Sequence, residues 1–234
     1  MDDMFTRSRA LLGVEKLNTL KNSHVCVVGI GGVGGYAVET LARAGVFNLT
    51  LVDHDVFTGS NLNRQLHALG STLGASKAQS ARDRVLQINP EANVRALEVM
   101  YTAQTRGQIF DRSYDYIIDA IDLVTHKLDL IQTAISENIP IISALGTGNK
   151  LDAGRLSVTD ISKTHGCPLA RVMRKELRDR GINHLTVVFS DEEKRQKSPI
   201  DEQGGKFVPS IPWVPAVAGI LLAQHVCRNL TGEL

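Results

Sequence analysis

The sequence predicts an α/β fold: a Rossmann-like, doubly wound and mostly parallel sheet with an elaborated C-terminal third. Short apolar, β-branched runs alternate with helical segments up to about residue 150, which is typical of a parallel sheet covered by helices. A glycine-rich turn directly follows the first apolar run. With 234 residues, 43% of them hydrophobic, the chain is long enough for one core and short for two. We therefore expect one domain over residues 1–234, with a core at about residues 20–150 that carries the glycine-rich turn and an elaborated part at about residues 151–234.

The elements of the first half follow from apolar runs and helix stop signals. Gly45 and Pro90 each end a helical pattern, and the second helix carries an apolar face spaced at the helical period. Strands are expected over residues 24–29, 49–53, 94–99, 114–122 and 139–145, and helices over residues 36–44, 76–89 and 127–137.

The pattern changes after Gly148. Strands are expected over residues 155–160 and 185–190, with a helix over residues 168–180 between them. Residues 191–212 are polar and rich in glycine and proline, which indicates a long loop that substrate could order. A helix over residues 214–229 closes the chain. Its apolar run is interrupted by Gln224 and His225 and is too short to span a bilayer.

Composition excludes several classes of protein. The formal net charge of +1 gives the whole chain no strong bias toward nucleic acid or membrane. Three widely spaced cysteines, Cys26, Cys167 and Cys227, argue against a disulfide framework, and without a CxxC pair a four-thiolate zinc site is excluded. The N-terminus has no apolar signal-peptide core. We expect a cytoplasmic protein that does not associate with membranes.

The glycine-rich turn predicts a nucleotide site. Its glycines, Gly29, Gly31, Gly32 and Gly34, let the backbone turn tightly between a strand and a helix and approach a phosphate. Asp53 follows the second strand, where a carboxylate binds ribose hydroxyls. These features alone would equally suit NAD.

Downstream polar residues favour a triphosphate over NAD. Arg64 and Lys77 can neutralise phosphate charge, and Asp122 can hold Mg²⁺ where the fourth strand ends. Taken singly, Arg64 and Lys77 could be surface cations, Asn61 a turn residue and Asp122 a helix N-cap. Their order and spacing as a set argue for a metal-bound ATP site.

The motifs GIGGVG, LVDHD, SNLNRQ, SKAQ and DAID together resemble the adenylating superfamily that includes ubiquitin-activating enzymes and sulfur-carrier activators. This resemblance implies that Asp53 binds ribose, that Asn61, Arg64 and Lys77 contact the triphosphate, and that Asp122 binds the metal. It also implies a homodimer in which Arg9 reaches the neighbour's ATP, with Arg7 as the second choice.

The helix expected over residues 168–180 is strongly basic. Between residues 163 and 180 the chain has six Lys or Arg residues and two acidic ones, a net charge of +4. Such a run is usually a solvated helix face, but it could also bind RNA phosphates. The candidate tRNA-binding residues are Arg171, Arg174, Lys175 and Arg178.

The C-terminal third is similar to tRNA threonylcarbamoyladenosine dehydratases, on the segments SVTDISKT, CPLARVMRKELRDRGI, VVFSDEE and FVPSIPWVPAVAGILLAQHV. The resemblance implies ATP-dependent adenylation of the threonyl carboxylate of modified tRNA, followed by cyclisation with net loss of water. The second step is intramolecular and needs no enzyme thioester. Cys167, at a helix start, could be a nucleophile, although an incidental cysteine is the plainer interpretation.

Several alternatives stay open. The chain could instead activate the C-terminal Gly-Gly of a small sulfur-carrier protein, or be a non-catalytic or NAD-binding module. His165 and His184 are candidates for the general base of ring closure by residue type only. A cysteine desulfurase or sulfur-carrier system is a further candidate partner.

Overall fold

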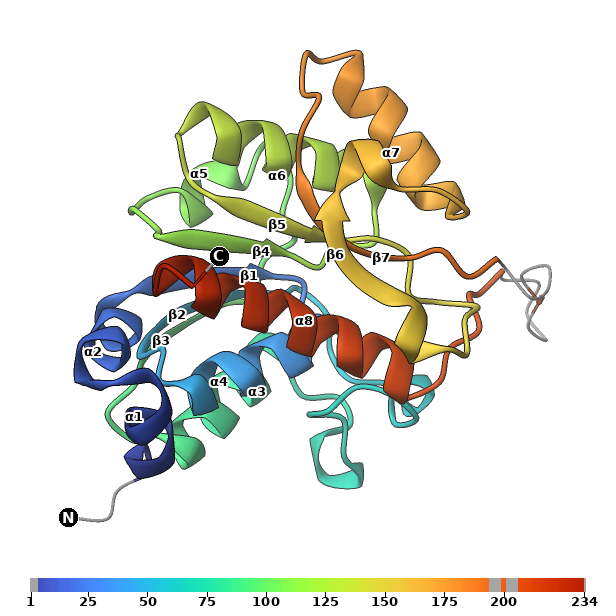
Figure 1. Cartoon of the computed structure of the whole chain (residues 1–234). Helices are drawn as coiled ribbons and strands as arrows, with labels where there is room; N and C mark the ends of the chain where they lie inside the picture. Colours follow the sequence, from blue (N-terminus) through green and yellow to red (C-terminus); the bar gives the residue numbers. More distant parts are fainter. Residues whose placement is uncertain (1–3, 194–198, 201–205, 234) are drawn as a thin grey trace.

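The seven strands of the described residues form one sheet in the order β3-β2-β1-β4-β5-β7-β6. The computed structural model describes residues 4–193, 199–200 and 206–233 (Figure 1). Every neighbouring pair is parallel except β6 with β7. The fold class predicted from the sequence is thus confirmed. The strands are β1 (His24–Val28), β2 (Asn48–Val52), β3 (Asn93–Leu97), β4 (Tyr116–Asp119), β5 (Ile141–Ala144), β6 (Leu156–Asp160) and β7 (Thr186–Ser190).

Helices cover both faces of the sheet (Figure 1). Successive strand residues point to opposite faces, so Val25 and Val27 enter one core while Cys26 and Val28 enter the other. The first core is closed by α2, α3, α4 and α8, and the second by α5, α6 and α7. The helices are α1 (Thr6–Leu12), α2 (Val14–Asn22), α3 (Gly34–Ala44), α4 (Lys77–Ile88), α5 (Arg106–Ile109), α6 (Val124–Ser136), α7 (Pro168–Arg178) and α8 (Trp213–Leu230).

The fourth strand is shorter than the sequence predicts. It ends at Asp119, whose carboxylate accepts a hydrogen bond from the Ile121 amide (3.1 Å) and starts a local turn. Asp122 therefore lies in the β4–α6 connection, and α6 begins at Val124. Helices α1, α2 and α5 were not predicted, because short or mixed segments carry a weak apolar period.

The C-terminal third extends the same sheet. Strand β7 adds parallel to β5, and β6 pairs antiparallel with β7. Helix α8 then packs on α3 so closely that a Cβ at Gly219 would lie 2.2 Å from the Val33 carbonyl oxygen. Much of the loop predicted over residues 191–212 falls outside the described residues, namely 194–198 and 201–205.

None of the helices in the described part of the chain has the length and hydropathy of a membrane span. Helix α8 is apolar, but most of its apolar side chains are buried against the sheet and α3.

Candidate functional site

The turn between β1 and α3 is built for close approach of a ligand to the backbone. Gly29 has φ +92°, a left-handed conformation that favours glycine, and a Cβ there would lie 2.6 Å from the Ala120 carbonyl oxygen. A Cβ at Gly34 would lie 1.8 Å from the Gly29 carbonyl oxygen. The start of α3 also places the positive end of its helix dipole beside the turn. This geometry suits a phosphate group.

A cavity of about 460 Å³ opens at the carboxyl ends of the parallel strands. Strands β1 and β4 are neighbours there, and the chain leaves them toward opposite faces of the sheet. This is the position at which open α/β sheets bind ligands. The volume lies within the range of small-molecule sites.

Seven of the predicted site residues line this single cavity, although they come from separate parts of the sequence: Gly29, Gly31, Gly32, Asp53, Arg64, Lys77 and Asp122. The structure therefore brings together the glycine turn, the predicted ribose ligand, two of the three predicted triphosphate ligands and the predicted metal ligand.

Asp53 is held at the end of β2 by two backbone amides. Its carboxylate accepts hydrogen bonds from Ile30 (2.6 Å) and Asp55 (2.8 Å). Each carboxylate oxygen has a second lone pair, so the group can still accept hydrogen bonds from ribose hydroxyls. The bond to Ile30 links the β2 end to the glycine turn, which sets the distance between the predicted ribose ligand and the predicted phosphate-binding turn.

Lys77 is buried and its ammonium group donates to the Asp55 carboxylate (2.8 Å). Burial alone would raise the pKa of Asp55, but the hydrogen bond and charge of Lys77 lower it below its ordinary value. Asp55 was not among the residues predicted from the sequence, although it is the second acidic residue of the LVDHD motif that supplies Asp53. Lys77, the first residue of α4, is thus a buried cation that lines the cavity.

Arg64 lies opposite the glycine turn, with its side chain 3.5 Å from the position of a Cβ on Gly32. Its guanidinium donates to the Ser60 carbonyl (2.8 Å) and to the Asn63 side-chain oxygen (2.9 Å). Burial lowers the pKa of Arg64, although an arginine remains charged at neutral pH. These contacts are to neutral oxygens, so the positive charge remains available to a phosphate.

Asp122 is exposed within the cavity wall, and within the described residues its carboxylate makes no hydrogen bond or ion pair. It is not the N-cap of α6, which is Leu123. An oxygen ligand of this kind suits Mg²⁺. The carboxylates of Asp53 and Asp55 also lie in the same cavity, and with His54 they place possible ligand atoms within 4.8 Å of one another.

The connection that carries Asp122 is anchored by a fully buried ion pair. Lys127 of α6 donates to the Asp119 carboxylate (2.7 Å), which also accepts from the Ser143 hydroxyl of β5 (2.7 Å). The other Asp119 oxygen accepts from the Ile121 amide. These bonds hold the β4 end and the start of α6 together, so the loop between them has a defined path.

Other predicted residues do not line the cavity. The Asn61 side chain accepts a hydrogen bond from the Thr58 amide (3.1 Å) and caps a short 3₁₀ turn, as the turn interpretation expects. Arg9 lies on α1, and Gly34 is buried beneath the turn. The basic residues of α7 also lie elsewhere; Arg174 donates to the Thr164 carbonyl (2.6 Å) and hydroxyl (2.7 Å).

The histidines proposed for ring closure both lie on the surface. His165 is 3.7 Å from an Asp191 oxygen, and His184 is 3.3 Å from an Asp160 oxygen. The cavity is instead lined by His126, by buried Lys150 and by buried Cys167 at the N-cap of α7. The sequence signal for Lys150 was its place just after β5, at the same sheet edge as the glycine turn.

Comparisons with known proteins show which family the chain resembles along its length. The ThiF family model matches residues 5–233. A tRNA threonylcarbamoyladenosine dehydratase from Bacillus subtilis is 43% identical over 98% of this chain and 95% of its own length. Crystal structures of the E. coli tRNA N6-threonylcarbamoyladenosine dehydratase in complex with AMP and with ATP are each 33% identical over 98% of this chain and 94% of theirs, with TM-scores of 0.89 and 0.88.

A more distant kind of relative is also similar. An adenylyltransferase and sulfurtransferase, UBA4 of Vanderwaltozyma polyspora, is 35% identical over 66% of this chain and 35% of its own length. The similarity to the dehydratases is higher and extends through the C-terminal third. Because the family model covers nearly the whole sequence, the chain belongs to the ThiF family.

Proposed function

We propose that this chain is an ATP-dependent tRNA threonylcarbamoyladenosine dehydratase. The observation that carries the proposal is the convergence of the glycine turn, Asp53, Arg64, Lys77 and Asp122 on one cavity, in a chain similar to dehydratases over 98% of its length. The reaction would adenylate the threonyl carboxylate of the modified tRNA base and then close that side chain into a ring, with net loss of water.

Adenylation addresses the poor reactivity of a carboxylate. A carboxylate oxygen attacks the α-phosphorus of ATP, the bond to the bridging oxygen breaks, and pyrophosphate leaves. Two anions must approach each other in this step, so the main task of the protein is positioning and charge neutralisation. Arg64 and Lys77 line the cavity beside the glycine turn and would neutralise charge on the phosphates. A Mg²⁺ ion held by Asp122 would supply further positive charge there.

Ring closure follows within the activated substrate. A nucleophilic atom of the substrate attacks the acyl carbon, and AMP leaves as the carbon–oxygen bond to phosphate breaks. Because both reacting groups belong to one molecule, the enzyme needs to hold them in a reactive conformation and exclude water. No step of this reaction needs a thioester or transfers sulfur, so the reaction itself requires no cysteine desulfurase or sulfur-carrier partner. Such a partner stays a prediction from the sequence.

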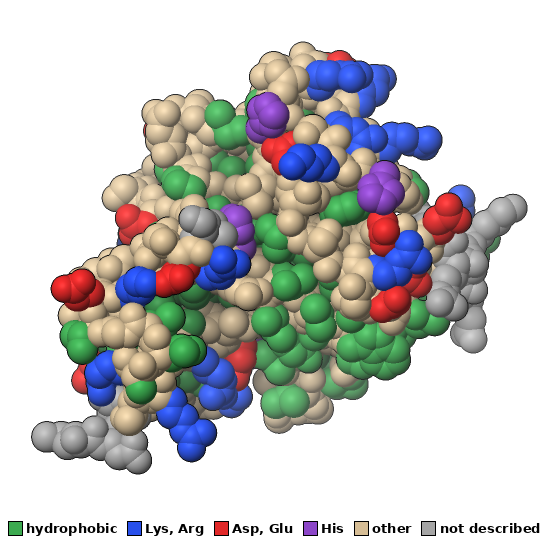
Figure 2. Space-filling model, viewed as in Figure 1, with side chains coloured by type: hydrophobic (Ala, Val, Ile, Leu, Met, Phe, Trp, Pro, Cys, Tyr) green, Lys and Arg blue, Asp and Glu red, His purple; other side chains and the backbone are tan. Residues whose placement is uncertain are grey.

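A homodimer is the second part of the proposal. Hydrophobic side chains gather over α8 and the adjoining end of β6 (Figure 2). Trp213 and Ile220 of α8 are 51% and 44% exposed, and Val158 of β6 is exposed beside them. Such a patch favours burial against a second copy. Arg9 lies outside the cavity lining of its own chain, which suits a role in the partner's site.

The tRNA partner is expected to contact α7. Basic side chains gather over this helix at the top of the molecule (Figure 2). Arg171, Lys175 and Arg178 are exposed, whereas Arg174 is half-buried and bonded to Thr164. The three exposed residues therefore form the better candidate surface for RNA phosphates.

Pyrophosphate exchange into ATP tests this function. The purified chain is incubated with ATP, Mg²⁺ and labelled pyrophosphate, together with tRNA that either carries or lacks the threonylcarbamoyl modification. Exchange stimulated by modified tRNA alone is the expected result. Equal exchange with both tRNAs would contradict it, and stimulation by a carrier protein ending in Gly-Gly would identify a sulfur-carrier activator instead.

A further inference from the structure

The cavity has a second end, beyond the nucleotide-binding turn. Its walls are the loop after β5, with Gly146 and Gly148, and the start of α7, with Cys167 and Leu169. Gly146 lies against the start of α7, because a Cβ there would be 3.6 Å from the Cys167 sulfur. Lys150, which follows this loop, also lines the cavity.

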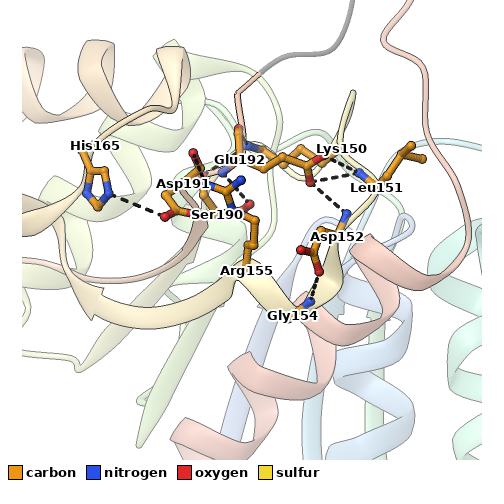
Figure 3. Close-up of polar contacts among 9 residues, drawn as sticks. All are labelled: Lys150, Leu151, Asp152, Gly154, Arg155, His165, Ser190, Asp191 and Glu192. Carbon is orange, nitrogen blue, oxygen red and sulfur yellow. Dashed lines mark hydrogen bonds and ion pairs between the residues drawn. The ribbon is translucent and has the colours of Figure 1, made fainter.

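Lys150 is only 4% exposed and is held by neutral oxygens. Its ammonium group donates to the carbonyl oxygens of Ser190 (3.2 Å) and Glu192 at the end of β7 (Figure 3). An ammonium has three N–H donors, so these bonds leave one.

The nearby carboxylates are directed elsewhere. That of Glu192 accepts from the amides of Leu151 (3.0 Å) and Asp152 (2.9 Å), and that of Asp191 accepts from Arg155 (2.7 Å) (Figure 3). Within the described residues, no carboxylate lies within 4.0 Å of the Lys150 ammonium.

The two other lysines that are buried in the described part of the chain show the contrast. Lys77 and Lys127 each contact a carboxylate, at 2.8 Å and 2.7 Å. A buried charge without such a partner is costly. Burial accordingly lowers the pKa of Lys150, while Cys167, Glu192 and Asp191 act in the opposite direction. A buried cation beside an open cavity, held but not neutralised, is a site for an anionic ligand.

We propose that Lys150 binds the carboxylate of the acyl substrate and orients it toward the α-phosphate of ATP. This inference rests on the proposed function and adds to it the residue that recognises the reacting group. The remaining N–H of Lys150 would hold the carboxylate oxygen that does not attack phosphorus. In ring closure the same oxygen gains negative charge as the acyl carbon is attacked, and the ammonium would stabilise it without giving up its proton.

Binding of paired RNA probes tests this assignment. The probes are anticodon stem-loops with threonylcarbamoyladenosine, as the free acid or as its methyl ester, and the enzyme is loaded with Mg²⁺ and α,β-methylene-ATP. We expect the wild type to bind the acid at least about tenfold more tightly than the ester, as one charge-assisted hydrogen bond predicts. Lys150→Met should bind both probes equally, and Lys150→Arg should restore part of the preference.

Lys21→Met is the matched control, since Lys21 lies on α2 outside the cavity, and should keep the wild-type preference. A purely structural Lys150 would change stability without changing the acid-to-ester ratio. Lys150→Gln, which can still donate to the two carbonyls, provides a second uncharged variant if the methionine variant does not fold. An unchanged ratio in the folded uncharged variant overturns the assignment. If modified RNA fails to stimulate exchange by the wild type, the proposed function fails first.

Discussion

Asp122 is an exposed carboxylate in the wall of the cavity, with no protein partner in the described part of the chain. Asp122→Asn keeps its shape but removes the charge that would hold a divalent cation. We expect pyrophosphate exchange to fall by about 100-fold or more, as loss of an electrostatic contact to a reacting group predicts. Thermal unfolding should not change.

The control for this variant is Asp83→Asn, because Asp83 is exposed on α4 and does not line the cavity. It should retain wild-type exchange. Full exchange by Asp122→Asn would remove Asp122 from the site, whereas loss in both variants would point to an effect of net charge.

His67 couples folding to pH. It is buried, its Nε2 atom has no hydrogen-bond partner among the described residues, and burial lowers the pKa of His67 from 6.5 to about 4. Between those pH values the unfolded chain binds a proton that the folded chain excludes. Stability should therefore fall as pH is lowered from about 6.5 to about 4, by up to about 3 kcal/mol from this residue.

Urea unfolding at a series of pH values measures this effect. His67→Leu removes the proton-binding site, so its free energy of unfolding should change less between pH 6.5 and pH 4 than that of the wild type. Parallel pH profiles for the two proteins would show that another group causes the loss.

The turn between β1 and α3 requires glycine at position 34. A Cβ at Gly34 would lie 1.8 Å from the Gly29 carbonyl oxygen, so Gly34→Ala must displace either α3 or the turn. We expect a loss of stability of about 2 kcal/mol or more, as overpacking predicts, together with weaker ATP binding by calorimetry. At Gly107 a Cβ would meet nothing within 4 Å, and Gly107→Ala should behave as wild type. Equal stability of both variants would mean that the turn relaxes freely.

Helix α7 has a buried apolar face and an exposed basic face. Met173 and Leu177 are buried, while Arg171 and Lys175 face outward. Reversing both exposed charges, as Arg171→Glu with Lys175→Glu, should weaken tRNA binding by about tenfold or more and reduce its salt dependence. ATP affinity should stay constant. Lys21→Glu is the control for a charge change elsewhere, and a similar loss in that variant would indicate only a long-range effect.

The predicted homodimer can be tested by mixing two inactive variants. If Arg9 acts in the partner's site, Arg9→Ala and Asp122→Asn should each abolish exchange, and mixing them should restore activity in one site of each mixed dimer. Random exchange of subunits then returns about a quarter of the wild-type sites. Arg9 acting within its own chain gives no recovery on mixing, because every site would then lack one of the two groups.

Local patterns in the sequence predicted the strands and most of the candidate residues that line the cavity. Apolar runs with helix stop signals indicated seven strands and the five longest helices, since each of these elements buries a face large enough to leave a periodic pattern. The glycine turn, Asp53 and Asp122 could be predicted because they follow strand ends, and parallel strands end at one edge, whereas Arg64 and Lys77 were predicted from the order and spacing of the motifs.

Those local patterns could not predict contacts between segments that are distant in the sequence. Nothing local distinguishes Lys150, which lacks a carboxylate partner in the described structure, from Lys127, which has one. The Asp55–Lys77 pair joins residues 22 positions apart, and Asn61 turns its side chain into its own loop. The sequence by itself determined the strands, the glycine turn and the types of residue that follow the strand ends. Only the tertiary structure decided which charges are neutralised within the protein and which remain for a ligand, because that depends on distances set by packing.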